Sequence, residues 1–389
     1  MRLWVVFVKS VRELVRDPLV LSMTLVFAPC FVLVYALFFP SGSTTYTILV
    51  LNQDSGAQSV QGAHLRAGEE VIAAINAVTY ADGKPLLKTR LVNGPAEATQ
   101  LLRDRAGLVF ITLPEDFSRS ILAMQASERT IPVTLTFGGD LTNPYYPVAA
   151  ILATSAVDAY VQDASGSQAP LRLVEQPLGE SAARTEFETY VPGLLVFASI
   201  MLVFMAAMTV AREVEAGTLR RVQITRMTAF DLLGGISAAL LLVGITAELL
   251  AFAAALALGF RSQGPIWVAI LVGALTSLSV IGAGLVVACF SRTVAQAFVI
   301  ANFPLAFFMF FSGVMYPIPK IAVFAIGQRT IGLFDFLPPT HAVVALNKVF
   351  NLGAGPREVA FELAALAVLS VLYFAAGVWL FHRRHMHVG

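Results

Sequence analysis

The chain has 389 residues, of which 57% are hydrophobic and only 13% charged, and its mean hydropathy is +0.76. Soluble domains are usually about 45–50% apolar and about 25% charged, so this composition excludes a soluble globular protein and predicts a polytopic membrane protein. The net charge of +1 conceals two unlike parts. Residues 40–189 hold 10 basic and 16 acidic residues, whereas the remainder holds 16 basic and 9 acidic residues. This asymmetry indicates that the two parts face different compartments or partners.

The first 17 residues have apolar side chains at helical spacing with basic residues opposite them. This pattern predicts an amphipathic helix lying in the cytoplasmic membrane interface. Pro18 then turns the chain into the membrane, and residues 18–39 are expected to form the first transmembrane helix. A signal peptide is disfavoured because this apolar run is too long and no A-x-A site follows it.

A bilayer-spanning helix needs about 20 mostly apolar residues, and six segments meet this requirement. They are Leu19–Phe39, Tyr190–Ala211, Phe230–Leu258, Ile266–Phe290, Val294–Tyr316 and Val359–Phe381. We therefore expect six transmembrane helices, with five of them in residues 190–389. Two carboxylates stand out in this pattern: Asp231 lies at an edge, and Glu248 lies well inside the third span.

The distribution of basic residues between the short loops sets the expected orientation. With the N-terminus inside, the cytoplasmic segments hold eleven basic residues: Arg2, Lys9, Arg12, Arg16, Arg212, Arg220, Arg221, Arg226, Arg292, Arg383 and Arg384. The short external segments hold five: Arg261, Lys320, Arg329, Lys348 and Arg357. Both termini are therefore predicted to be cytoplasmic, and residues 40–189 to be extracytoplasmic.

Residues 40–189 are long enough for one folded core and alternate between strand-like and helix-like patterns. Strands are predicted at Tyr46–Leu51, Leu86–Val92, Leu108–Thr112 and Ile131–Phe137. Helices are predicted at Leu65–Val78, Ala96–Arg103, Pro114–Met124 and Tyr146–Val161. The fold class is therefore a six-helix membrane protein with an inserted extracytoplasmic α/β domain, and Asp163–Pro170 is the expected linker.

No ATP-binding motif is visible, because Gly83–Lys84 has Val78 in place of the first glycine of a P-loop and Pro85 after it. The histidine-rich tail, from His382 to His387, is interpreted as a positively charged cytoplasmic flank rather than a metal site. We expect no metal site and no catalytic residue, so the chain is not predicted to be an enzyme.

The segment 212–228 joins the second and third spans and is short, amphipathic and densely charged. A basic membrane anchor and a docking helix for a cytoplasmic partner are both open readings, although a mixed-sign surface suits specific pairing better than lipid attraction. The residues expected at such a contact are Arg212, Glu213, Glu215, Gly217, Thr218, Leu219, Arg220 and Arg221.

Several motifs together resemble the type 2 ATP-binding-cassette (ABC) exporter permeases, in the branch with a large external domain after the first span. The E-x-E-x-G-T-L run at Glu213–Leu219 is similar to the coupling segment of that family. Further similar pieces are Arg16-Asp17-Pro18 with Pro29, Asn52-Gln53-Asp54, Leu113–Phe117, Ser291–Ala297, Phe311–Pro319 and Leu337–Ala342. Arg220-Arg221 departs from the family, many members of which carry an acidic residue there.

The resemblance implies a mechanism. Two permease chains, identical or paralogous, would pair around a central path, and each would dock on a separately encoded cytoplasmic ATPase that binds ATP and Mg. Closure of the ATPases would then push on the coupling segment and reorient the spans.

Residues 316–356 are too interrupted by prolines for one helix and too apolar for a solvated loop. Non-helical backbone at membrane depth must be buried in protein or line a cavity, so we expect short re-entrant helices capping the external mouth; two interfacial helices that stabilise a dimer are the alternative. The residues expected at this gate are Phe311, Ser312, Gly313, Pro317, Pro319, Pro338 and Pro339.

Glu248 is the other residue of interest, because an ionisable group inside the membrane is costly and is by default a functional hypothesis. It either contacts a cationic group of the cargo or senses protons, and with Phe307 and Phe308 it would then line a possible substrate path. Alternatively, it is a structural group that is hydrogen-bonded to Thr246 or to a neighbouring helix.

The leading prediction is the permease of an ATP-driven exporter for an amphipathic or hydrophobic compound such as a drug, a lipid or a peptide-like metabolite. The alternatives are a proton-coupled transporter that uses Glu248 and a receptor that uses residues 40–189 to hold a ligand. Expected partners are the ATPase, a second permease chain, membrane lipid and an envelope protein, but no nucleic acid.

Overall fold

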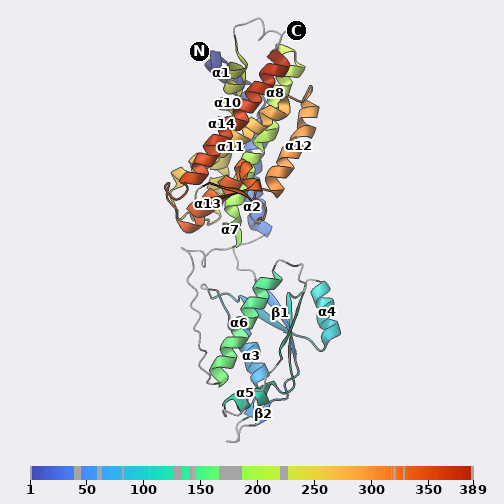
Figure 1. Cartoon of the computed structure of the whole chain (residues 1–389). Helices are drawn as coiled ribbons and strands as arrows, with labels where there is room; N and C mark the ends of the chain where they lie inside the picture. The colour runs from blue at the N-terminus through green and yellow to red at the C-terminus, as the bar shows by residue number, and fades with distance from the viewer. Residues whose placement is uncertain are drawn as a thin grey trace. The chain divides into compact units, whose positions relative to one another are not determined.

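The computed structural model describes residues 2–38, 45–58, 64–80, 83–104, 106–125, 134–139, 143, 145–165, 186–219, 227–316, 318, 321–326 and 329–386. The chain divides into two compact units. One comprises Gly42–Gln176, and the other comprises Met1–Ser41 together with Pro177–Gly389. Figure 1 shows a sheet with helices in the first unit and a bundle of long helices in the second.

The unit Gly42–Gln176 is built on a four-stranded sheet with the order β4-β1-β5-β6. Its strands are β1 (Tyr46–Asn52), β4 (Leu87–Leu91), β5 (Val109–Leu113) and β6 (Thr136–Gly139). Strand β1 is parallel to β4 and β5, and β6 is antiparallel to β5. Two short strands, β2 (Ala57–Gln58) and β3 (His64–Leu65), pair separately.

Helices cover both faces of this sheet. The helices are α3 (Ala67–Asn76), α4 (Pro95–Arg103), α5 (Phe117–Gln125) and α6 (Tyr146–Ser165). Ile48 and Val50 of β1 pack into a core with α3, α5 and α6, whereas Leu49 and Leu51 pack with α4. The first three predicted strands are confirmed within a residue or two. The fourth begins at Thr136 in the described residues, and α6 continues into the expected linker as far as Ser165.

The second unit contains nine named α-helices in the part of the chain that the structure describes. They are α1 (Arg2–Arg16), α2 (Pro18–Phe38), α7 (Glu186–Ile200), α8 (Leu202–Glu215), α10 (Ala229–Ala257), α11 (Ile266–Ala288), α12 (Val294–Phe310), α13 (Pro338–Leu352) and α14 (Ala360–Phe381). In Figure 1, α1 and the C-terminal end of α14 lie at one end of this bundle, and α13 lies at the other.

Four helical segments of the described residues are long and apolar enough to cross a membrane: Phe187–Glu215, Ala229–Ala257, Ile266–Ala288 and Ala360–Met386. Two shorter apolar helical stretches, Thr24–Leu37 and Val294–Phe310, coincide with the expected first and fifth spans. The unit therefore fits a polytopic membrane protein. The expected fifth span is too long at its C-terminal end, because α12 ends at Phe310 and the chain bends before Tyr316.

Helix α11 is the centre of the bundle, and it packs against α7, α8, α10, α12, α13 and α14. Two glycines bring neighbouring backbones close to it. Gly284 faces Val203 and Ala206 of α8, and Gly282 faces Tyr373 of α14; a Cβ at either position would overlap these neighbours. Small residues at helix interfaces permit this close approach, which is the usual way that membrane helices gain packing contacts.

The region 316–356 differs in part from the short re-entrant helices that we expected. A β-hairpin of β7 (Ala322–Ile326) and β8 (Arg329–Gly332) occupies its first half. A short 3-10 helix (Leu333–Phe336) and α13 follow. The expectation of short helices is therefore wrong for residues 322–332, where β-branched and aromatic residues such as Val323 and Phe324 favour strands, and the helices that follow agree with it.

Candidate functional site

The predicted coupling segment begins on a helix rather than in a loop. Helix α8 continues through Arg212 and Glu213 to Glu215, and it ends where Gly217 adopts a φ of +68°. Glycine reaches this left-handed conformation without steric cost, which is why it commonly ends helices. Thr218 and Leu219 follow the turn, whereas Arg220 and Arg221 lie outside the described residues.

Glu213 makes intramolecular contacts at this end of α8. Its carboxylate accepts a hydrogen bond from Lys9 Nζ of α1 at 2.6 Å, and the Thr218 hydroxyl lies 2.5 Å from its second oxygen. The Glu213 side chain is only 12% exposed. Burial alone would lower the pKa of Lys9, but the hydrogen bond and charge of Glu213, with a contribution from Glu13, raise it above its usual value.

Two neighbouring residues connect the same segment to other helices. Glu215 Oε2 accepts a hydrogen bond from the backbone N–H of Val294, the first residue of α12, at 2.8 Å. Arg212 lies 3.8 Å from Asp17, which separates α1 from α2. Leu219 is buried in the bundle core. The segment thus joins α1, α8 and α12, and its glutamates contact this chain's own helices, which sequence patterns did not predict.

Helix α12 leads from this polar cluster to a cavity at the opposite end of the bundle. The cavity has a volume of about 360 Å³, within the usual range for ligand pockets. Phe311, Ser312 and Gly313, the first three residues of the predicted gate, follow α12 directly and line it. The remaining lining residues are Ile318, Ile321, Gly332, Phe334, Asp335, Thr340, Val343, Val344 and Asn347.

The cavity is mostly apolar with a few fixed polar groups. The Phe311 ring stacks on Phe334 with centroids 5.4 Å apart. Asp335 accepts a hydrogen bond from the Gly332 backbone at 2.8 Å, and Thr340 donates to the Phe334 carbonyl at 2.8 Å. Apolar walls with a small number of oriented polar groups are typical of sites for amphipathic ligands.

The other predicted gate and path residues divide into two groups. Pro338 and Pro339 are buried in the first turn of α13. Backbone N–H groups in a first turn have no acceptor within the helix, so proline removes no helical hydrogen bond there. Pro317 and Pro319 lie outside the described residues. Phe307 is 55% exposed, whereas Phe308 is buried in the bundle core. The structure therefore does not bring Phe307 and Phe308 to one surface.

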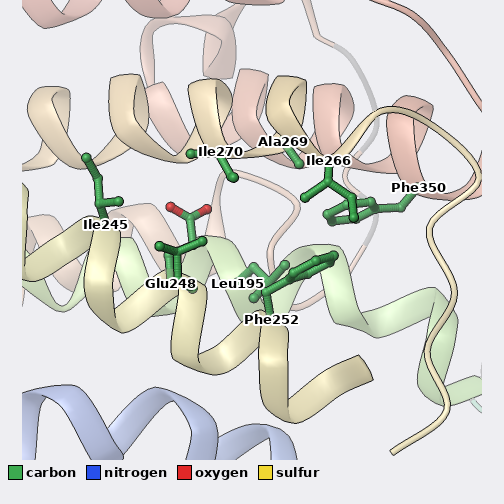
Figure 2. Close-up of a pocket in the computed structure, with 9 residues that line it drawn as sticks. Leu195, Ile245, Glu248, Phe252, Ile266, Ala269, Ile270 and Phe350 are labelled. Atoms are coloured by element: carbon green, nitrogen blue, oxygen red, sulfur yellow. The ribbon is translucent and has the colours of Figure 1, made fainter. Parts of the chain in front are cut away.

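Glu248 lies between α10 and α11 and is 8% exposed. Figure 2 shows its carboxylate directed towards α11, among apolar side chains. It lines a small cavity of about 20 Å³ with Leu195, Phe252 and Ile270, among others. Gly273 of α11 faces it so closely that a Cβ there would overlap the carboxylate.

The contact predicted between Glu248 and Thr246 does not form, because the Thr246 hydroxyl donates to the Leu242 carbonyl at 2.8 Å. Within the described part of the chain, the Glu248 carboxylate makes no hydrogen bond and no ion pair. A group of this kind is expensive to bury without a partner, so its presence calls for an explanation other than packing.

A partly buried ion pair was not identified from the sequence. Lys348 of α13 donates to Glu362 of α14 at 2.7 Å, and the Glu362 side chain is only 5% exposed. Its second oxygen, Oε2, has no hydrogen-bond partner in the described structure. Glu362 lies inside the expected sixth span, Val359–Phe381. A carboxylate within this apolar run was therefore the sequence signal that pointed to Glu362.

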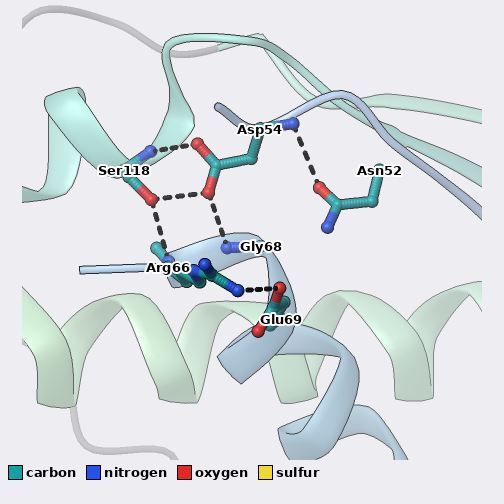
Figure 3. A network of polar contacts seen from close by, with 7 residues as sticks. Asn52, Asp54, Arg66, Gly68, Glu69 and Ser118 are labelled. Atoms are coloured by element: carbon teal, nitrogen blue, oxygen red, sulfur yellow. Dashed lines mark hydrogen bonds and ion pairs between the residues drawn. The ribbon is translucent and has the colours of Figure 1, made fainter. Parts of the chain in front are cut away.

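A carboxylate with several hydrogen bonds lies in the unit Gly42–Gln176, after the carboxyl end of β1. Figure 3 shows Asp54 between the start of α3 and the start of α5. It accepts hydrogen bonds from the Gly68 backbone at 3.0 Å, the Ser118 backbone at 2.9 Å and the Ser118 hydroxyl at 2.5 Å. Burial opposes ionisation of Asp54, but these hydrogen bonds and one from Gly56 outweigh it and hold its pKa below the usual value.

Comparison with known proteins assigns the family. Residues 19–379 match the family described as "ABC-2 family transporter protein". The chain is also 24% identical over 316 residues to the "Probable multidrug ABC transporter permease YbhR" of Escherichia coli K12, and equally to that of Escherichia coli O157:H7. Each alignment covers 77% of both chains. Members of this family are transport subunits that pair with an ATPase subunit. This multi-pass chain belongs to the ABC-2 family of transporter permeases.

Proposed function

We propose that the chain is the permease of an ATP-driven exporter that moves an amphipathic or hydrophobic compound out across the inner membrane of a prokaryote. The cargo classes that suit it are drugs, lipids and lipid-like or peptide metabolites. The mostly apolar cavity at Phe311 and Phe334 supports this choice, as does the name of the E. coli relatives, which describes them as probable multidrug permeases.

One observation carries the proposed mechanism: a single helix, α12, links the coupling segment to the cavity. Its first residue, Val294, donates to Glu215 at 2.8 Å, and its C-terminal neighbour Phe311 lines the cavity. A helix of this length spans about 25 Å at 1.5 Å per residue. A push on the coupling segment would therefore reach the cavity through one continuous helix, in which Pro304 removes one backbone hydrogen bond.

The proposed partners follow from the same arrangement. A separately encoded ATPase that binds ATP and Mg would press on Gly217, Thr218 and the residues that follow, while Glu213 and Glu215 transmit the displacement to α1 and α12. A second permease chain, identical or paralogous, would complete the transport path. The acidic unit Gly42–Gln176 would face the extracytoplasmic side, where it is available to an envelope partner.

The test is to replace Glu213 and Glu215 together with glutamine in the full chain and to reconstitute it with its ATPase in liposomes. We expect ATP hydrolysis to continue while export falls at least about tenfold, since the links to α1 and α12 are lost. Glu69→Gln, at an exposed glutamate of α3, is the matched control and should retain export. Unchanged export in the double variant would remove the coupling role of these glutamates.

A second function is favoured by one observation, the lack of any hydrogen bond to the buried Glu248 carboxylate in the described residues. A proton-coupled transporter would use this group as its proton carrier. Transport that is driven by a pH gradient without ATP hydrolysis, and is lost in Glu248→Gln, would support this function over the first.

A further inference from the structure

An open apolar groove runs along the outside of the helical unit between α10 and α14. It has a volume of about 670 Å³. Phe230 at the start of α10 and Phe374, Ala375, Val378 and Trp379 of α14 form most of its walls. The Phe230 and Phe374 rings meet edge to face with centroids 5.9 Å apart, and Trp379 is 58% exposed.

One end of this groove is polar and positively charged. Thr228 and His382 line it there, and the Arg383 guanidinium lies over the Trp379 ring, 5.6 Å from its centroid. In the described part of the chain, no carboxylate pairs with Arg383. Its neighbour Arg384 is different, because it contacts the Phe290 ring at 4.2 Å and the Cys289 carbonyl at 3.4 Å.

An acidic side chain in the first turn of α10, close to Thr228, is already engaged. Asp231 accepts hydrogen bonds from the Thr228 hydroxyl at 2.7 Å and from the Thr228 backbone at 3.0 Å, which caps α10. The guanidinium of Arg2 is also near enough to interact with its charge. No ion pair joins Asp231 to Arg383 in the described residues, so the guanidinium at the mouth of the groove remains available to an anion.

We propose that this groove binds one anionic phospholipid, with its phosphate at Arg383 and an acyl chain along Phe230, Phe374 and Val378. The apolar walls match the chain, and the planar guanidinium matches a phosphate. Tryptophan is typical of the depth at which head groups meet the hydrocarbon. Basic pockets between membrane helices on the cytoplasmic side bind anionic head groups for the same reasons.

The same charges argue against a second copy of the chain as the occupant. A two-fold contact through this groove would set the same patch against itself. Arg383 of one copy would then face Arg383 of the other, and in the described residues no carboxylate pairs with this guanidinium. The lipid, in contrast, supplies the negative charge that the groove lacks.

Native mass spectrometry of the purified full chain in detergent tests this inference, with equal amounts of phosphatidylglycerol and phosphatidylcholine added. We expect phosphatidylglycerol to be retained preferentially by the wild-type chain. Arg383→Gln should lower its occupancy about fivefold, which corresponds to about 1 kcal/mol for one basic residue at an anionic head group. Arg383→Lys should retain most of the preference. Arg357→Gln, the same change of charge before α14, is the matched control and should have no effect.

A second variant tests the acyl site without a change of charge. Ala375→Phe fills the groove and should also reduce phosphatidylglycerol occupancy. Equal retention of both lipids by the wild-type chain, or unchanged selectivity in Arg383→Gln or in Ala375→Phe, would overturn the proposal. Conversion of a dimer to a monomer by Ala375→Phe, with lipid occupancy unchanged, would assign the groove to a second copy instead. The measurement needs neither ATPase nor cargo, so its outcome is independent of the proposed transport function.

Discussion

Asp54 and Glu248 are carboxylates of one chain in opposite surroundings. Asp54 accepts three hydrogen bonds from Gly68 and Ser118 and holds the starts of two helices together. Glu248 is buried among apolar side chains and, in the described residues, has no hydrogen-bond partner. A saturated carboxylate contributes to stability, whereas an unsatisfied one costs stability and persists for another reason. The comparison therefore predicts a structural role for Asp54 and a functional role for Glu248.

Replacement of Asp54 gives the largest expected effect on stability. Asp54→Ala removes the acceptor for α3 and α5 at once, so we expect the unit Gly42–Gln176 to lose about 3 kcal/mol, given about 1 to 2 kcal/mol for each helix cap. Hydrogen exchange of peptides from α3 and α5 in the full chain measures this loss. Glu69→Ala is the control, because its pair with Arg66 is exposed and should contribute less than about 1 kcal/mol. Equal protection in both variants would contradict the structural role of Asp54.

Replacement of Gly273 tests how closely Glu248 is packed. Gly273→Ala places a methyl group where the carboxylate lies, so we expect a loss of about 2 kcal/mol from overpacking. The thermal unfolding midpoint in detergent measures it. Gly94→Ala, where a Cβ meets nothing within 4 Å, is the matched control. Glu248→Ala added to Gly273→Ala should restore most of the loss, and a failure to do so would place the strain elsewhere.

Glu248→Gln separates stability from function. No described hydrogen bond is lost, so we expect the stability to change by less than about 1 kcal/mol. Transport should nevertheless fall about tenfold, which corresponds to about 1.4 kcal/mol. Export assays in liposomes and unfolding in detergent measure the two quantities on the same preparation. Normal transport with reduced stability would reverse the assignment and make Glu248 a structural residue.

The smallest expected effect is the pH dependence of the unit Gly42–Gln176. The pKa of Asp54 is lower in the folded state than its ordinary value of 3.8. Its contribution to stability is therefore complete above that value and is lost as the pH falls through the lower, folded-state pKa. Hydrogen exchange should show little change attributable to Asp54 between pH 7 and about pH 5. Asp54→Asn should remove the additional loss at more acidic pH, and an equally steep loss in that variant would assign it to other groups.

Local patterns predicted the elements better than they predicted the contacts. The alternating run at Tyr46–Leu51 became β1, and the amphipathic N-terminus became α1. The sheet order β4-β1-β5-β6 did not follow from the sequence, because strand pairing depends on contacts between distant segments. The hairpin at 322–332 was missed because the prolines around it dominated the interpretation of that region.

The same limit applies to the candidate site. Glu213 was identified by its motif, but its partner Lys9 is 204 residues away in the sequence. Glu215 and Val294 are 79 residues apart. Spacing within a segment cannot report such pairs. Glu362 was detectable as a carboxylate in an apolar run, although only the structure shows that Lys348 neutralises it.

Helix α11 has a mechanical consequence that follows from its glycines. Gly284 and Gly282 meet α8 and α14 without a side chain of their own, so no side chain of α11 interlocks with these helices at those two positions. Packed helices with smooth contacts shift along one another by small shear movements without rotamer changes. We would then expect α8, whose C-terminal end carries the predicted coupling segment, to shift along α11 while α11 keeps its position.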